Sequence, residues 1–347
     1  MKRLSSAKIL GVTAGLLLAW LLVALVCLSI GSVPIPLRTS LRLLAGWLAG
    51  GNPNDSLASV LFSVRLPRIL LGSLVGAALA TAGTAFQALL RNPLADPYVL
   101  GVSTGASMGT IVYSVFAGWL GFAAGGGMLF ARPVAAFAGA ALTVGAVYAV
   151  ATGRHPAPES SQRLLLSGIV LASFLSSINV FLLTITSQAD LRGIFYWLIG
   201  DLSRPVDPSL CVVTGLVFGG FFVLYLLSHS LNLIGMGEED AMALGIEVRR
   251  VKTAVYIVAS LITGAVVSIS GPIAYIGLIC PHMGRMMFGS DHRVLFPSVF
   301  LFGAIFTLLA DTVARTIVSP AELPVGIVTA LCGAPLFIYL LRRKGGQ

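Results

Sequence analysis

The sequence predicts an all-α integral membrane protein with about ten transmembrane helices, built as a single domain over residues 1–347. Two observations predict this class. Hydrophobic residues make up 57% of the chain and charged residues only 10%, with a mean hydropathy of +0.95, whereas a soluble domain carries about 25% charged residues. The apolar residues also fall into long runs, and about 20 such residues are needed for one spanning helix.

Turn-forming or charged residues divide the chain into ten apolar runs. Because lipid offers no partner to backbone polar groups, each run is expected to be helical. The predicted spans are 9–30, 65–90, 98–118, 132–152, 163–186, 209–229, 252–271, 272–288, 293–316 and 324–341.

The ends of these runs support the assignment in chain order. The first follows Lys2, Arg3 and Lys8 and is too long for a signal-peptide core, so we expect an uncleaved helix. The second begins at Arg65 and ends at a proline-rich hinge over 91–97 that leads into the third. The fourth to sixth are separated by charged loops and by residues 187–208. Only a short Gly-Pro break separates the seventh from the eighth.

Two connections are too long for tight turns. Residues 31–64 form a sizeable segment between the first two spans, and residues 187–208 contain the aromatic run Phe195-Tyr196-Trp197. That run is typical of an interfacial helix, and an aromatic belt at the membrane surface also explains it.

Basic residues indicate the orientation. With the N-terminus inside, fourteen of the 22 Lys and Arg residues fall on the inner side and eight on the outer side. This bias favours cytoplasmic N- and C-termini. It also explains the net charge of +9 without a nucleic-acid partner. The eight outer residues are all arginine.

A weak internal repeat is present. Gly76-Ala77, Gly83 and Leu90 recur as Gly264-Ala265, Gly271 and Leu278, at a constant offset of 188 residues. The two copies lie in spans of opposite predicted direction, as in the inverted repeats of many transporters.

Several kinds of site are not indicated. The four cysteines are scattered through apolar runs and predict neither a disulfide nor a metal site. His282 has no second ligand at metal spacing, and we interpret it as a residue that packs or bonds to the backbone. No phosphate-binding loop or hydrolase motif occurs, so we expect no catalytic residue and no cofactor bound by this chain.

Four motifs together resemble one family. They are RLPR at 65–68, RNPLADP at 91–97, the G-x-x-x-A-x-x-x-G loop at 237–245 and GPIAYIGLICPH at 271–282. The stretch from residue 65 to the C-terminus is similar to the FecCD family, the permeases of ABC importers for iron-siderophores, haem and cobalamin. The resemblance implies a type II importer permease fold in a bacterial or archaeal cytoplasmic membrane. It also implies a homodimer, two cytoplasmic ATPase subunits that use ATP, and an extracytoplasmic substrate-binding protein.

The resemblance also implies roles for particular residues. Arg65, Arg68 and Arg315 would dock the binding protein. Asn92, Leu94, Ser161 and Gln162 would form the cytoplasmic gate. The ATPase-coupling loop would comprise Gly237, Glu238, Glu239, Ala241, Leu244 and Gly245. We expect Gly245 to adopt a left-handed backbone conformation, with Ala241 on a small-residue face that a partner approaches.

Other interpretations stay open at this point. The outer arginines can instead extend to the membrane surface or pair internally, as Asp311 and Arg315 would at a spacing of four residues. The loop at 237–245 can be a plain connector. The whole chain can be a stand-alone secondary transporter, although no acidic residue falls in the middle of a span, and an intramembrane enzyme is a more distant alternative. Iron-siderophore is the first candidate substrate, followed by cobalamin and haem.

Overall fold

The computed structural model describes residues 6–31, 33–50, 56–119, 130–153, 161–186, 188–203 and 209–344. Helices account for almost all of these residues. In chain order they are α1 (Ser6–Ser29), α2 (Leu37–Leu48), α3 (Ser56–Ser59), the π-helical η1 (Val60–Arg65), α4 (Leu66–Leu89), the 3-10 turn η2 (Pro97–Leu100), α5 (Val102–Trp119), α6 (Ala131–Thr152), α7 (Ser161–Thr184), α8 (Gln188–Ile199), α9 (Ser209–Leu226), α10 (Ser228–Met236), α11 (Glu238–Ala243), α12 (Val248–Ser270), α13 (Ile276–Phe288), α14 (His292–Thr316) and α15 (Val325–Lys344).

Helices lie at all ten predicted spans, but their lengths differ. Within the described residues, 7 helices are long and apolar enough to cross a membrane, and two shorter apolar helices lie at Val102–Ala117 and Val325–Ile338. The eighth predicted span contains only α13, whose 13 residues extend about 20 Å. The number of complete crossings therefore stays a prediction.

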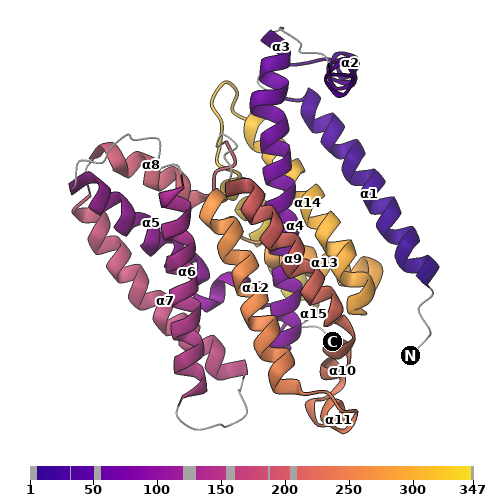
Figure 1. Cartoon of the computed structure of the whole chain (residues 1–347), viewed down its shortest axis with the longest axis vertical. Helices are drawn as coiled ribbons and strands as arrows, with labels where there is room; N and C mark the ends of the chain where they lie inside the picture. Colours follow the sequence, from indigo (N-terminus) through magenta and orange to yellow (C-terminus); the bar gives the residue numbers. More distant parts are fainter. Residues whose placement is uncertain are drawn as a thin grey trace.

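Helix α4 forms the centre of the molecule (Figure 1). It packs against α14, α12 and α13, while α1 covers the outer side of α14. Helices α5, α6, α7 and α8 form a second layer, which joins the centre through contacts of α12 with α5 and α6. Nearly all of α4 is buried, which explains why its sequence has no polar face.

Glycine allows α4 to approach its neighbours backbone to backbone. A Cβ placed on Gly83 would lie 1.9 Å from the carbonyl oxygen of Gly277 in α13, and one on Gly76 would lie 2.2 Å from that of Gly303 in α14. Small residues at helix crossings are typical of membrane proteins, where close van der Waals packing drives association. The sequence pattern in this span therefore reflects packing.

The break between α12 and α13 is longer than predicted. Helix α12 ends at Gly271 with φ +68°, and α13 begins only after Tyr275, which has φ +69°. Helices α4 and α12 run in opposite directions in Figure 1, as the proposed inverted repeat requires. Its matched glycines differ in position, however, because Gly83 lies inside α4 and Gly271 ends α12.

Both long connections contain a helix. Helix α2 lies in the first and α8 in the second, where the indole of Trp197 is buried while Phe195 and Tyr196 are exposed. Only part of the aromatic run can therefore face the membrane surface.

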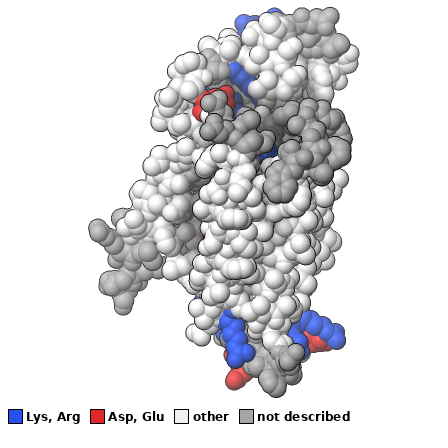
Figure 2. All heavy atoms as spheres, turned by 90° about the vertical axis from the view of Figure 1, so that its left-hand side faces the viewer, with Lys and Arg blue, Asp and Glu red and all other residues white. Residues whose placement is uncertain are grey.

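Figure 2 shows Lys, Arg, Asp and Glu side chains gathered toward the two ends of the visible face, with a broad uncharged band between them. Such a band is the expected appearance of a bilayer-spanning region.

Candidate functional sites at the two ends and the family match

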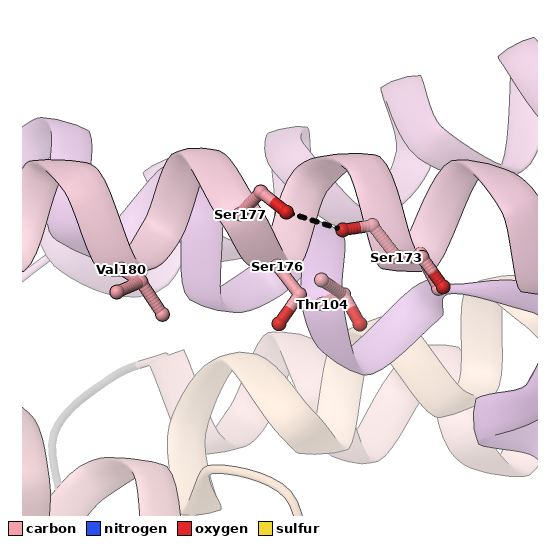
Figure 3. Close-up of a pocket in the computed structure, with 6 residues that line it drawn as sticks. Thr104, Ser173, Ser176, Ser177 and Val180 are labelled. Carbon is pink, nitrogen blue, oxygen red and sulfur yellow. Dashed lines mark hydrogen bonds between the residues drawn. The ribbon is translucent and has the colours of Figure 1, made fainter.

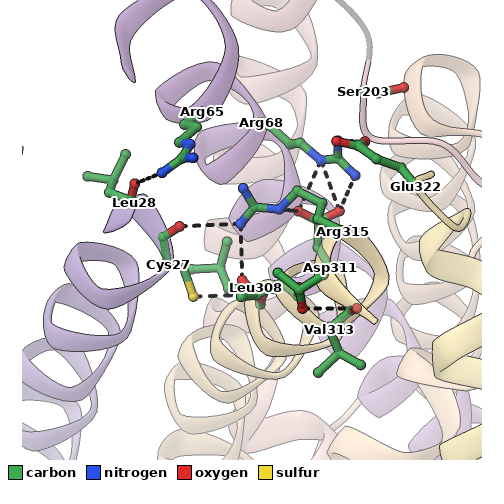
Figure 4. Close-up of polar contacts among 12 residues, drawn as sticks. Cys27, Leu28, Arg65, Arg68, Ser203, Leu308, Asp311, Val313, Arg315 and Glu322 are labelled. Carbon is green, nitrogen blue, oxygen red and sulfur yellow. Dashed lines mark hydrogen bonds and ion pairs between the residues drawn. The ribbon is translucent and has the colours of Figure 1, made fainter. Parts of the chain in front are cut away.

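Five charged side chains, named here the arginine cluster, gather where α4 begins and α14 ends (Figure 4). They are Arg65, Arg68, Asp311, Arg315 and Glu322. Arg65 ends η1 and Arg68 lies in the first turn of α4, whereas Asp311 and Arg315 lie one turn apart in α14. Glu322 comes from the connection between α14 and α15. The packing of α14 against α4 brings these segments together.

Asp311 is the centre of the cluster (Figure 4). The guanidinium of Arg68 donates hydrogen bonds to both of its carboxylate oxygens, at 2.9 and 3.0 Å. On the other side, Arg315 forms an ion pair with Asp311 at 3.2 Å. Arg68 also contacts Glu322 at 2.6 Å. A bidentate pair of this kind fixes the planar guanidinium in one orientation.

Arg65 and Arg315 are also bonded to the backbone of α1 and its end. Arg65 donates to the carbonyl of Leu28 at 2.7 Å and to that of Val33. Arg315 donates to the carbonyl of Cys27 at 3.3 Å. These carbonyls lie at or just beyond the end of α1, where carbonyls lack helical partners. The arginines therefore also hold α1 against α4 and α14.

The structure thus places the three predicted docking arginines in one cluster, but their side chains are buried within the protein. Their exposed fractions are 3% for Arg65, 5% for Arg68 and 4% for Arg315. The predicted Asp311–Arg315 pair is present. Glu322 was not identified from the sequence, because nothing local to it indicates a partner 254 residues away.

The hinge after α4 lies near the lower end. Arg91 adopts a left-handed conformation with φ +47°, and the Asn92 side chain accepts a hydrogen bond from the Leu94 amide at 2.9 Å. Asp96 caps η2 by accepting from the Tyr98 amide at 2.8 Å. Burial raises the pKa of the Asp96 carboxyl to about 6, while the hydrogen bond from the Tyr98 amide acts in the opposite direction.

The hinge is bonded to the α12–α13 break. The Tyr98 hydroxyl donates to the Ile273 carbonyl at 3.2 Å and accepts from the Ile273 amide at 3.0 Å. One turn before the hinge, Gln87 donates to the carbonyls of Gly277 and Leu278 at 3.4 and 3.3 Å. The two irregular segments of the chain therefore support one another, although the sequence separates them by some 175 residues.

The predicted gate residues have different positions. Asn92 is half-buried in the hinge, and Leu94 is 43% exposed. Gln162 is exposed in the first turn of α7. Ser161 begins α7, but its side chain lies outside the described residues. The gate assignment stays a prediction for all four.

The predicted coupling loop forms the short helix α11 at the lower tip of Figure 1. Glu238, Glu239 and Asp240 occupy its first turn, where carboxylates complement the amide end of a helix. Gly245 has φ +83°, which confirms the expected left-handed conformation. Gly237 has φ 169°, an extended conformation open to any residue.

The apolar residues of this loop divide into an inner and an outer set. Ala241 is fully buried against Ile234 and Val248, so its small side chain fits an internal contact, whereas the sequence predicted a partner-facing surface. Leu244 and Met242 are instead 65% and 55% exposed. Met242 was missed from the sequence, because its exposure depends on how α11 packs against α10 and α12 and has no local signal.

Arg91 links the hinge to the acidic helix. Its guanidinium donates to the Ile234 carbonyl at 2.6 Å and lies 3.5 Å from the Glu238 carboxylate. Lys252 in α12 binds the same carboxylate at 2.7 Å. The Glu238 carboxylate therefore contacts both Arg91, which follows α4, and Lys252 in α12. A displacement of α11 would change both contacts.

Comparison with known proteins identifies the family. The model of the FecCD transport family matches residues 16–343. The chain belongs to the FecCD family. This chain is therefore the non-catalytic permease subunit of an ABC transporter. A permease of this kind works with an ATPase and a binding protein.

Individual relatives agree along nearly the whole chain. It is 37% identical over 335 residues to the hemin transport system permease protein HmuU of Yersinia pestis, covering 96% of this chain and 97% of that protein. It is 41% identical over 282 residues to the cobalamin import system permease protein BtuC of Halobacterium salinarum, covering 81% and 73%.

A solved structure also matches. It is described as an inward-facing conformation of a metal-chelate type ABC transporter, with a TM-score of 0.82 at 31% identity, covering 96% of this chain and 99% of that one. This agreement confirms the predicted all-helical permease fold.

Proposed function

We propose that this FecCD permease moves a metal chelate into the cytoplasm by alternating access, driven by ATP hydrolysis in its partner subunits. An iron-siderophore is the first candidate substrate, followed by cobalamin and haem. The observation that carries the proposal is the family match over residues 16–343. Relatives named for hemin and for cobalamin support the class of cargo.

The proposed assembly pairs two copies of this chain with two ATPase subunits and one binding protein. The lower end of Figure 1 faces the cytoplasm in this proposal. Two features support the orientation: the excess of Lys and Arg in the segments assigned to that side, and α1, which begins toward the same end as α11. Both termini would then be cytoplasmic.

The arginine cluster is the proposed docking site for the binding protein. Its three guanidiniums face two carboxylates, so one positive charge is left over for an acidic partner. Glu322 is the accessible member, with a side chain 41% exposed against 6% for Arg68. We propose that a carboxylate of the binding protein replaces Glu322 at Arg68, since the fork of an arginine accepts such a group through two hydrogen bonds.

This docking proposal predicts that Glu322→Gln strengthens binding. In this variant the incoming carboxylate no longer has to displace an internal ion pair. A pair this exposed is worth about 0.2–1 kcal/mol, so the affinity should rise by about 1.4- to fivefold. The measurement is the Kd of the binding protein for the complex in nanodiscs, at low and high salt. A weaker complex would show that Glu322 itself takes part in docking, and the exchange would have to be abandoned.

The α11 helix is the proposed contact of the ATPase, with Leu244 and Met242 as its exposed apolar residues. The link from Glu238 to Arg91 supports a path from this contact to the hinge that holds the gate candidates. Ala241→Trp should abolish stimulated ATP hydrolysis, because the indole has no room in this fully buried position and displaces α11. Full stimulation in this variant would show that α11 is only a connector.

Reconstitution tests the function as a whole. The complex is placed in vesicles with ATP inside, the binding protein and radio-iron chelate outside, and no ion gradient. The proposal expects uptake that depends on ATP and persists with an uncoupler. A stand-alone secondary transporter gives the opposite pattern: uptake without ATP that collapses with the gradient.

A further inference from the structure

A polar pocket opens between α5 and α7, in the helical layer beside the centre (Figure 3). Its volume is about 680 Å³. Four of its six lining side chains carry hydroxyl groups. The lining consists of Thr104 from α5 and of Ala172, Ser173, Ser176, Ser177 and Val180 from α7. Such a concentration of hydroxyls contrasts with the neighbouring exposed side chains of α7, among them Ile169, Val170 and Phe174, which are large and apolar.

Two of the hydroxyls already donate hydrogen bonds to backbone carbonyls of α7. Ser173 Oγ donates to the Ile169 carbonyl at 2.9 Å, and Ser177 Oγ donates to the Ser173 carbonyl at 3.2 Å. Both oxygens therefore offer only lone pairs to the pocket. The hydroxyls of Thr104 and Ser176 have no hydrogen-bond partner among the described residues, so they can donate or accept.

An amide lies beside the pocket. Asn179 is only 8% exposed, and its Nδ2 donates to the Thr104 carbonyl at 3.2 Å. This bond holds α7 against α5 next to the hydroxyl groups, while the Asn179 side chain itself does not line the pocket. The acceptors that a ligand would meet are therefore the four lining hydroxyls.

The pocket contains no charge to balance an ionised ligand. None of its described lining residues is ionisable. A carboxylate that leaves water for this site would lose its hydration without gaining a cation, which is costly in a low-dielectric membrane layer. Uncharged groups with N–H and O–H donors meet the available acceptors at no such cost.

We infer that this pocket binds the uncharged, donor-bearing face of the transported chelate. The chain is therefore selective for net-neutral chelates with amide, hydroxamate or hydroxyl groups over chelates with free carboxylates. The inference rests on the proposed function, which it narrows to a substrate class. It also separates this chain from the relative named for hemin, since hemin carries two carboxylates.

Direct binding tests the selectivity without the binding protein, which has a preference of its own. The permease–ATPase complex in nanodiscs is dialysed against a radio-iron neutral tris-hydroxamate complex and, separately, against ferric dicitrate. We expect the neutral chelate to bind at least about tenfold more tightly. Equal affinity, tighter binding of ferric dicitrate, or no measurable binding of either would overturn the inference.

A charge placed in the pocket sharpens the test. Ser176→Lys should shift the affinity ratio toward ferric dicitrate by about tenfold or more, because an ammonium supplies the missing counter-charge. Ser176→Gln has similar length without charge and should leave the preference for the neutral chelate in place. An unchanged ratio in Ser176→Lys, with the ATPase still co-purifying, would also overturn the inference. ATP-dependent uptake of either chelate decides the proposed function independently.

Discussion

Replacement of Asp311 by asparagine should be among the most destabilising single polar changes in this chain. The Asp311 side chain is 2% exposed and lies between Arg68 and Arg315, whose side chains are 6% and 5% exposed. Without it, two buried guanidiniums lose their shared counter-charge. Breaking a buried ion pair by removing one partner costs about 3–5 kcal/mol. Glu322→Gln is the matched control, because its pair with Arg68 is 41% exposed on the acidic side and should contribute only about 0.2–1 kcal/mol.

The assay is equilibrium unfolding of the purified permease in mixed micelles, which gives the free energy of unfolding of each variant. Adding Arg315→Met to Asp311→Asn should recover part of the loss, since it removes the guanidinium left without a carboxylate partner, whereas Arg68 keeps its pair with Glu322. If Glu322→Gln destabilises as much as Asp311→Asn, or if Asp311→Asn is neutral, the central role of Asp311 in the arginine cluster is refuted.

Three further predictions concern the lower half and the helix crossings. Gly83→Ala should destabilise by about 1–3 kcal/mol, since its Cβ would meet a backbone carbonyl; Gly15→Ala, with nothing within 4 Å of the new Cβ, should be harmless in the same unfolding assay. Gly245→Val forces a β-branched residue into a left-handed conformation and should cost about 1–2 kcal/mol, measurable as a lower midpoint temperature, whereas Gly245→Asn should lose less. Arg91→Gln should reduce uptake per ATP hydrolysed, because it removes the bond from the hinge to α11; Arg250→Gln, whose side chain is 82% exposed, should leave that ratio unchanged.

The fold could be predicted well from the sequence because each membrane helix is marked by a local run of apolar residues. Runs of apolar residues and the Gly-Pro break were sufficient to place helices, and the left-handed Gly245 followed from its position after a helix. The surroundings of the charged residues could not be predicted in this way. Arg68 finds its partners 243 and 254 residues away, so its burial depends on how α4 packs against α14. The inward position of Ala241 is likewise set by α10 and α12.

Part of the polar pocket has a local signal in the sequence. Ser173, Ser176 and Ser177 recur at the spacing of one helix face, which is a readable signal in an otherwise apolar span. Their partner Thr104 lies in a different helix, however, and only the packing of α5 against α7 places it opposite them.

The glycine crossings of α4 have a consequence for motion. Where two backbones touch, no side chain lies between them to change rotamer and absorb a shift, so α4, α13 and α14 should travel together as one rigid body. The irregular segment at 271–275 begins with the same kind of contact, since a Cβ on Gly271 would lie 2.0 Å from the carbonyl oxygen of Trp197 in α8. The hydroxyl of Tyr98 joins this segment to η2 through its two bonds to Ile273, so a shift of α13 should be passed on to both η2 and α8.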